Sequence, residues 1–171
     1  MIKIEKHMDD DFTHVYKLAG KIDGIVQHPE HVYKIMADHF GDTFFVAKEK
    51  NEYGEDEILG FMLGFLSRKI EGSIFVWQIA VSEQAQGKSI GSGLLEHTVE
   101  YAYKTTDCKS VLATVEVENI ASQKLFEKMN FEIVSKNFIS EQKALVTSNG
   151  KEAVKNYYGS GTDQIFYRLM V

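Results

Sequence analysis

The chain has 171 residues, of which 44% are hydrophobic and 26% are charged, and its formal net charge is −6. This length fits one domain with a proper core, so a single domain over residues 1–171 is expected. The acidic balance argues against nucleic acid as a partner, because binding a phosphate backbone needs clustered lysine and arginine. One cysteine, Cys108, excludes an intramolecular disulfide and fits a reducing compartment.

Secretion and membrane attachment are not expected either. The N-terminus lacks the apolar core of a signal peptide. The longest apolar stretch, residues 58–66, is far shorter than the ~20 residues that a spanning helix needs. We therefore expect a soluble, cytoplasmic protein, and a homodimer is compatible with the sequence.

Apolar spacing divides the first half of the chain into strands and helices. Residues 58–66 are apolar on both faces, as expected of a central strand covered by helices. The expected elements are an edge strand at 2–4, a helix at 12–18 capped by one of residues 9–11, a helix from Pro29 to about residue 40, and strands at 43–47, 58–66 and 73–81.

The second half continues the alternation and predicts a mixed α/β sheet flanked by helices. The polar segment at residues 135–162 has no clear pattern, and its part at residues 140–161 is long for a connection, so we expect a substrate-side loop there. The expected elements are helices at 90–105 and 121–129 and strands at 110–115, 131–134 and 165–170.

Residues 82–93 carry the strongest functional signal. An apolar strand precedes this glycine-containing segment and a helical pattern follows it. Such a strand, turn and helix direct unpaired backbone N–H groups and the positive end of a helix dipole at one point, which attracts a phosphate. The segment therefore predicts a site for a phosphate-bearing cofactor.

Three kinds of phosphate loop compete for this segment. The glycines do not follow the Gly-x-Gly-x-x-Gly order of a dinucleotide site. A Walker A loop would match Gly87-Lys88-Ser89 but needs a glycine at Ser82, and only Glu116 stands in weakly for its magnesium-binding carboxylate. An acetyl-CoA loop of the form Gln-x-x-Gly-x-Gly is the third interpretation, with residues 86–91 in that place.

Two segments resemble the motifs of the GNAT N-acetyltransferase superfamily. Residues 76–95 are similar to its central motif, and residues 119–131 to its second motif, Asn-x-x-Ala-x-x-Leu-Tyr-x-x-x-Gly-Phe. Three positions depart from the pattern: Ser89 and Asn130 stand where glycine is usual, and Phe126 stands where many members have tyrosine. The resemblance implies a GNAT-like mixed sheet, acetyl-CoA as the cofactor, and acetyl transfer to a primary amine by direct attack of the neutral amine on the thioester.

The resemblance also implies which residues hold the cofactor. Backbone groups of residues 79–81 would pair with the pantetheine arm as a further strand would, and the loop would hold the pyrophosphate. The implied cofactor residues are Ile79, Ala80, Val81, Gln86, Gly87, Lys88, Ser89, Gly91, Ser92, Asn119 and Ser122.

Acetyl transfer further requires a group that takes the proton of the amine and a donor for the leaving thiolate. The candidate bases are Glu116, Glu118 and Asp163, each of which is otherwise a solvated surface charge. Phe126 cannot protonate the thiolate, which leaves Tyr157, Tyr158, a water or unassisted departure. The histidines lack the spacing of a metal site, so no metal is expected.

Trp77, Gln78 and Tyr33 are the candidate substrate residues. Trp77 and Gln78 are neighbours on one strand, so alternation predicts that one faces the substrate and the other the opposite layer. Residues 75–81 and 39–47 also resemble the L-2,4-diaminobutyrate acetyltransferases of ectoine biosynthesis, in which Asp23 and Tyr33 would match fragments of an upstream motif that is otherwise missing here.

The acceptor is therefore expected to be a small amine, with a diamino acid such as 2,4-diaminobutyrate as the first choice. A polyamine, another amine or a protein N-terminus is the alternative within the same activity. A P-loop-like nucleotide-binding protein and an idle CoA-binding module are the alternatives of another class.

Overall fold

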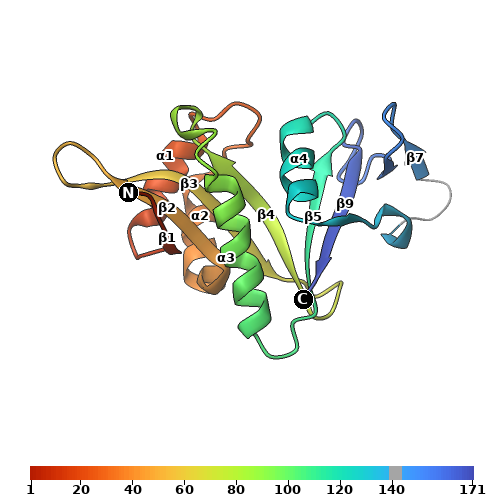
Figure 1. The fold of residues 1–171 in the computed structure, drawn as a ribbon, viewed down its shortest axis with the longest axis horizontal. Coiled ribbons are helices and arrows are strands. Elements are labelled where there is room, and N and C mark those ends of the chain that lie inside the picture. The colour runs from red at the N-terminus through yellow and green to blue at the C-terminus, as the bar shows by residue number, and fades with distance from the viewer. Residues whose placement is uncertain (139–143) are drawn as a thin grey trace.

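A computed structural model describes residues 1–138 and 144–171 of the chain (Figure 1). Its helices are α1 (Asp11–Ala19), α2 (Glu30–Phe40), α3 (Ile90–Lys104) and α4 (Ile120–Lys128). Its strands are β1 (Lys3–Lys6), β2 (Phe44–Lys50), β3 (Asp56–Leu66), β4 (Ser73–Val81), β5 (Ser110–Glu116), β6 (Glu132–Ile133), β7 (Ala144–Val146), β8 (Glu152–Val154) and β9 (Gln164–Met170).

The strands form one mixed sheet in the order β1-β2-β3-β4-β5-β9-β8-β7, with β6 paired to β9. Every pair is antiparallel except β4 and β5, which are parallel and joined through α3. The predicted fold class, a mixed α/β sheet flanked by helices, is thus confirmed. No helix in the described ranges is long and apolar enough to cross a membrane.

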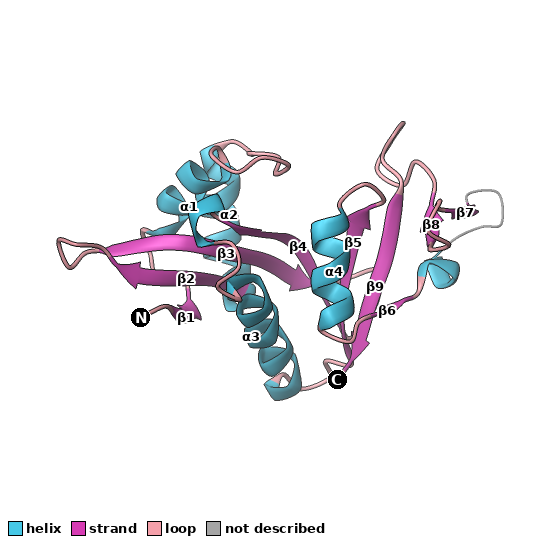
Figure 2. Ribbon diagram, turned by 45° about the horizontal axis from the view of Figure 1, so that its top comes forward, coloured by secondary structure: helices cyan, strands magenta, loops and turns pink. Residues whose placement is uncertain are grey.

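Helices cover both faces of the sheet (Figure 2). On one face, α3 and α4 enclose an apolar core that includes Leu94, Leu95 and Phe126. On the other face, α1 and α2 enclose a second core around Val15 and Tyr33. The apolar character of β3 on both sides, which the sequence shows, follows from this double cover.

The parallel strands β4 and β5 part along their length. Ser73 to Val76 pair with Ser110 to Ala113, and no pairing continues beyond these residues. In Figure 1 the two strands lie together near the C-terminus and diverge towards their own C-terminal ends. The edge of β4 that faces β5 is therefore open from Trp77 onwards, within the part of the chain that the structure describes.

A β-bulge at Trp77 changes the direction of the side chains on β4. Leu63 of β3 lies opposite Gln78, whereas Gly64 lies opposite Val76, so Trp77 is the extra residue. Trp77 and Ala80 both pack towards the α1–α2 core. Gln78, which alternates with Ala80, therefore lies on the same face as Trp77, and the prediction that these two neighbours face opposite layers is wrong.

Two other local predictions need correction. Helix α1 begins at Asp11 without a side-chain cap from Asp10; the Asp11 carboxylate accepts the backbone N–H of Met8 at 2.7 Å and pairs with the buried Lys48 at 2.8 Å. The predicted substrate-side loop at residues 140–161 contains the β7–β8 hairpin, which extends the sheet beside β9, while residues 139–143 lie outside the described part.

Candidate active site

A cavity of about 640 Å³ lies where the β4–α3 loop meets the start of α4. The loop enters α3 through two left-handed residues, Gly87 at φ +79° and Ser89 at φ +60°. This conformation explains why glycine is usual at position 89 in the resembling family, because serine occupies it at a cost in backbone strain. We call this space the first cavity.

The loop presents unpaired backbone donors to the first cavity. Among the described residues, none accepts a hydrogen bond from the N–H groups of residues 87–92; the ladder of α3 begins with the bond from Gly93 to Ser89 at 3.0 Å. Donors of this kind at the start of a 15-residue helix suit an anion. Together with the open edge of β4, this geometry fits the pyrophosphate and pantetheine arm of acetyl-CoA.

Of the predicted cofactor residues, all except Lys88 line the first cavity. Lys88 is exposed and is not part of the wall. Asn119 also has a structural role that the sequence analysis missed, because its side chain caps α4 by accepting the backbone N–H of Ser122 at 3.0 Å.

A second cavity of about 600 Å³ lies between the diverging strands β4 and β5. Trp77 and Gln78 line it from the bulge, and His28 lines it from the α1–α2 loop. The imidazole of His28 stacks on the indole of Trp77 with ring centroids 4.8 Å apart. The wall therefore offers an aromatic face, which attracts ammonium groups.

The two cavities share part of their walls. The residues common to both are Gly24, Ile25, Ile79, Glu116, Asn119 and Ser122. A ligand bound in the first cavity can therefore contact a ligand bound in the second beside Glu116, at the C-terminal end of β5. We call this place the junction.

The structure separates the three candidate bases. Glu116 lines both cavities, whereas Glu118 lines only the first. Asp163 lines neither; its carboxylate accepts the backbone N–H of Asn156 at 2.8 Å and so holds the β8–β9 loop. By position, Glu116 is the carboxylate best placed to accept a proton from a group at the junction.

Tyr33 is placed away from both cavities. It is fully buried in the core between α1 and the sheet, where its hydroxyl accepts the backbone N–H of His28 at 3.3 Å. Its desolvated hydroxyl has a raised pKa. Tyr33 supports the loop that carries His28, and this position does not support direct contact with a substrate.

The aromatic residues near position 126 differ in role. Phe126 is buried against Tyr167, with ring centroids 5.6 Å apart, and it also lines the second cavity. Tyr157 and Tyr158 are the two tyrosines that could supply the hydroxyl that Phe126 lacks. Only Tyr158 lines that cavity. Its hydroxyl bonds Thr114 at 3.0 Å, and desolvation raises its pKa, so it remains a neutral donor.

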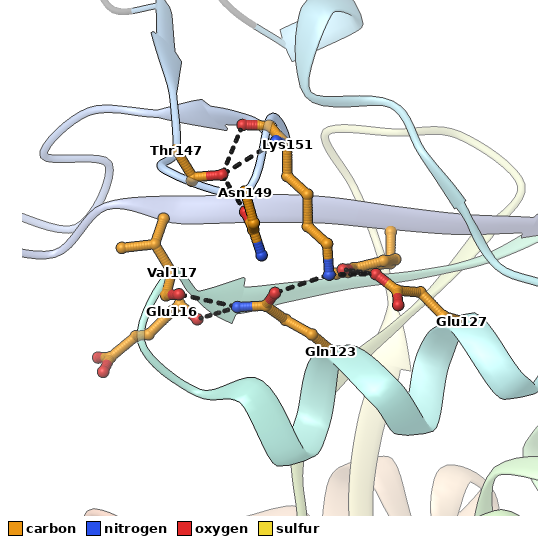
Figure 3. A network of polar contacts seen from close by, with 8 residues as sticks. Glu116, Val117, Gln123, Glu127, Thr147, Asn149 and Lys151 are labelled. Atoms are coloured by element: carbon orange, nitrogen blue, oxygen red, sulfur yellow. Dashed lines mark hydrogen bonds and ion pairs between the residues drawn. The ribbon is translucent and has the colours of Figure 1, made fainter.

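A polar network anchors the loop that carries Glu116 (Figure 3). Gln123 of α4 is fully buried; its Nε2 donates to the carbonyl oxygens of Val117 at 2.8 Å and Glu116 at 3.4 Å. Lys151, just before β8, donates to Gln123 Oε1 at 2.8 Å and pairs with Glu127. The β7–β8 hairpin thus braces the backbone beside the junction.

Sequence reasoning missed His28 and the α1–α2 loop. Residues 22–26 of this loop line one or both cavities, and Gln78 Nε2 donates to the carbonyl oxygen of Val26 at 2.9 Å. These residues belong to no motif and follow no periodicity. Only the Asp23 and Tyr33 fragments of the upstream resemblance pointed to this region of the chain.

Comparison with known proteins gives consistent matches. The profile of the family described as "Acetyltransferase (GNAT) family" matches residues 4–131. The L-2,4-diaminobutyric acid acetyltransferase of Shouchella clausii (strain KSM-K16) is 31% identical over 129 residues, which cover 75% of this chain and 68% of that protein. The enzyme of the same name from Virgibacillus pantothenticus is 29% identical over 133 residues, which cover 75% of this chain and 80% of that protein.

A solved structure has a similar fold. The diaminobutyrate acetyltransferase EctA from Paenibacillus lautus, in complex with its substrate L-2,4-diaminobutyric acid and coenzyme A, superposes with a TM-score of 0.70. The superposition covers 99% of this chain and 95% of that chain at 19% sequence identity.

Proposed function

This chain belongs to the acetyltransferase (GNAT) family and is an acetyl-CoA-dependent N-acetyltransferase, and we propose that its acceptor is a small diamino acid such as L-2,4-diaminobutyrate. The proposal for the acceptor is supported by the names of the relatives at about 30% identity and by the second cavity. Since acetyl-CoA is the cosubstrate, we place the reaction in the cytoplasm.

One observation carries the proposal: two cavities of different chemistry meet beside a single carboxylate. The first is walled by backbone donors that suit phosphates, and the second by the stacked pair of Trp77 and His28. Among the described residues that line the second cavity, Glu116 is the one acidic side chain and none is lysine or arginine. An acceptor with net positive charge suits this wall.

We assign the chemistry at the junction to Glu116. Bound acetyl-CoA would supply the thioester carbon that the neutral acceptor amine attacks. The C–N bond would form as the C–S bond breaks, and the CoA thiolate would leave and take up the proton that the attacking nitrogen loses. An amine is protonated at neutral pH, so Glu116 would take one proton from it, directly or through a water, before attack. Backbone groups of β4 near Ile79, on the wall common to both cavities, would position the thioester.

The other groups of a diamino acid also find partners in the second cavity. Its non-reacting ammonium would lie against the indole of Trp77. Its carboxylate would accept hydrogen bonds from His28 and from the hydroxyl of Tyr158, which line the same cavity. Because Tyr158 does not line the first cavity, we assign it to the carboxylate rather than to the leaving thiolate.

An acceptor panel tests the proposal. Release of CoA would be followed with 2,4-diaminobutyrate, ornithine, lysine, spermidine and a simple monoamine. We expect the highest kcat/KM with 2,4-diaminobutyrate. A monoamine that equals or exceeds it would refute the diamino-acid acceptor while leaving the N-acetyltransferase activity intact.

A further inference from the structure

Ser122 brings a side-chain hydroxyl to the junction of the two cavities. Of the described residues that line both cavities, only Ser122 and Asn119 have a side chain that donates hydrogen bonds when Glu116 is ionised. The Asn119 side chain also caps α4, whereas the hydroxyl of Ser122 has no such structural task. Ser122 therefore offers a hydrogen-bond donor that borders the ligands of both cavities.

The helix fixes the direction of the Ser122 side chain. Residues three and four apart lie on one face of a helix, with Cβ atoms about 5–6 Å apart. Leu125, three residues further on, lines the first cavity, and Phe126, four residues further on, lines the second. The side chain of Ser122 therefore lies on the part of α4 where the two cavities meet. Its backbone N–H is already bonded to Asn119 at 3.0 Å, so the hydroxyl is the donor that it presents there.

This hydroxyl is free to bind a ligand. Within a helix, serine and threonine commonly donate to the carbonyl oxygen four residues earlier. Thr98 and Thr105 of α3 do so, at 3.0 Å and 2.8 Å. No described residue forms a hydrogen bond with Ser122 Oγ, and the residue is only partly buried, so its hydroxyl remains accessible.

Acetyl transfer requires a donor at this place. The sulfur of the thioester gains negative charge as the C–S bond breaks, and a hydrogen bond directed at developing charge lowers the barrier of a reaction. Phe126 has no hydroxyl, and Tyr158 lines only the second cavity, where we assign it to the carboxylate of the acceptor. Ser122 is one helical turn from Phe126 and also lines the first cavity.

We propose that Ser122 Oγ donates a hydrogen bond to the sulfur of acetyl-CoA as the thiolate leaves, and that Ser122 is thereby a catalytic residue. The inference rests on the acetyl transfer of the proposed function and deepens it, and it does not depend on which amine is the acceptor. The electron pair of the C–S bond passes to the sulfur, which later takes up the proton that the attacking nitrogen loses. Serine keeps its own proton, because an alcohol is a far weaker acid than a thiol, whose pKa is about 8.5.

The thiol of bound CoA reports this contact without any acceptor. Its ionisation would be followed by the absorbance of the thiolate, as the difference between the complexes with CoA and with desulfo-CoA, in which the contributions of the tyrosines cancel. A hydrogen bond to the thiolate lowers the pKa of the thiol, so Ser122→Ala should raise this pKa by about 1 or more. Ser122→Thr keeps the hydroxyl and should leave the pKa within about 0.3 of the wild-type value.

Single-turnover kinetics test the catalytic role. With the acceptor of highest kcat/KM in the panel, Ser122→Ala should slow acetyl transfer roughly 10- to 100-fold. The affinity for acetyl-CoA should change by less than about threefold, because the hydrogen bond strengthens only as the thiolate forms. The double variant Ala121→Ser/Ser122→Ala moves the hydroxyl to a neighbour that lines only the first cavity and should not restore the rate. Thermal unfolding would report the folding of each variant.

The outcomes separate this inference from the choice of acceptor. An unchanged thiol pKa in Ser122→Ala would overturn the inference, even if the rate fell, and would leave Ser122 a structural residue. A raised pKa with an unchanged single-turnover rate would overturn the catalytic role, and so would recovery of the rate in the double variant. The titration of bound CoA needs no acceptor, so its result holds even if the acceptor panel refutes the diamino acid.

Discussion

The wall of the first cavity around Gly87 and Ser89 is built from backbone, whereas the wall of the second around Trp77 and Gln78 is built from side chains. This part of the first wall depends on two left-handed residues and the start of one helix, all within residues 86–92. The second brings together the α1–α2 loop, the bulge of β4, the end of β5 and Tyr158.

The difference teaches how each side of the site is specified. A backbone-built phosphate site needs a short contiguous segment and is insensitive to most side chains within it. A side-chain-built wall such as that of the second cavity depends on elements up to 140 residues apart, from Gly24 to Gln164. Variants of the first should therefore affect acetyl-CoA, and variants of the second should affect the acceptor.

The largest loss of activity is expected at the junction, because Glu116 lines both cavities and a change there should affect the reaction rather than the binding of one substrate. Glu116→Gln should lower kcat about 100-fold or more, because a general base contributes at least that factor. Both KM values should change little. Glu118→Gln, which alters a carboxylate of the first cavity only, should lower kcat less than Glu116→Gln does. An equal or larger loss of kcat would transfer the role of base to Glu118.

Gly91→Val should lower the affinity for acetyl-CoA roughly 30- to 100-fold and leave the acceptor KM within about twofold of the wild-type value. Gly91 lines the first cavity, and a Cβ there would already lie 3.4 Å from the Leu125 side chain. The two methyl groups of valine must then narrow the cavity. Calorimetry with acetyl-CoA measures the change, and unaltered affinity would refute the assignment of this loop to the cofactor.

Trp77→Ala should raise the acceptor KM about tenfold to thirtyfold, because it removes the indole against which the ammonium of the acceptor would lie and on which His28 stacks. The KM for acetyl-CoA should remain within about twofold. Trp77→Phe keeps a smaller aromatic face, so its acceptor KM should lie between those of the wild type and of Trp77→Ala. A shift in acetyl-CoA KM as large as that of the acceptor would contradict the division between the cavities.

Lys151→Met should lower kcat a few-fold with little change in either KM, since it loosens the network that holds the backbone of Glu116 and Val117. It also leaves the buried Gln123 Oε1 without its donor, which costs about 1–3 kcal/mol of unfolding free energy. Lys151→Arg should recover part of kcat. A stability loss without any change in kcat would limit Lys151 to a structural role.

The Lys151–Glu127 pair adds a small pH dependence to that stability loss. The hydrogen bond from Lys151 lowers the pKa of Glu127, so the pair stabilises the fold above the unfolded pKa of about 4.3 and less as pH falls through the folded value. The Glu127 side chain is 40% exposed, so this part should stay below about 1 kcal/mol. The difference between wild type and Lys151→Met in unfolding free energy should therefore shrink below about pH 4.

Ser89→Gly should have the smallest effect. Acetyl-CoA affinity should stay within about tenfold, because the hydroxyl adds at most one hydrogen bond of ~1 kcal/mol to a phosphate. Stability should rise by up to ~1 kcal/mol, because glycine adopts φ +60° without strain. Asn130→Gly, with φ +62° at the end of α4, is the matched control and should show a similar or smaller gain without any effect on acetyl-CoA.

The sequence by itself determined what is local. Apolar periodicity located β4 from Ser73 to Val81 and α3 from Ile90 to within a residue of its end. Two contiguous motifs predicted the mixed sheet, the family and the place of the phosphate loop. Local signals suffice there, because a turn of left-handed residues at a helix start needs no distant partner to present its N–H groups.

Only the tertiary structure could reveal the second cavity, where we place the acceptor. The bulge at Trp77 arises from the pairing of β3 with β4, and alternation along one strand could not reveal it. The splay of β4 from β5 opened the second cavity, and the α1–α2 loop brought His28 onto Trp77. The ranking of Glu116 over Glu118 and Asp163 likewise required their places around the cavities, because three similar carboxylates differ in surroundings and not in sequence signal.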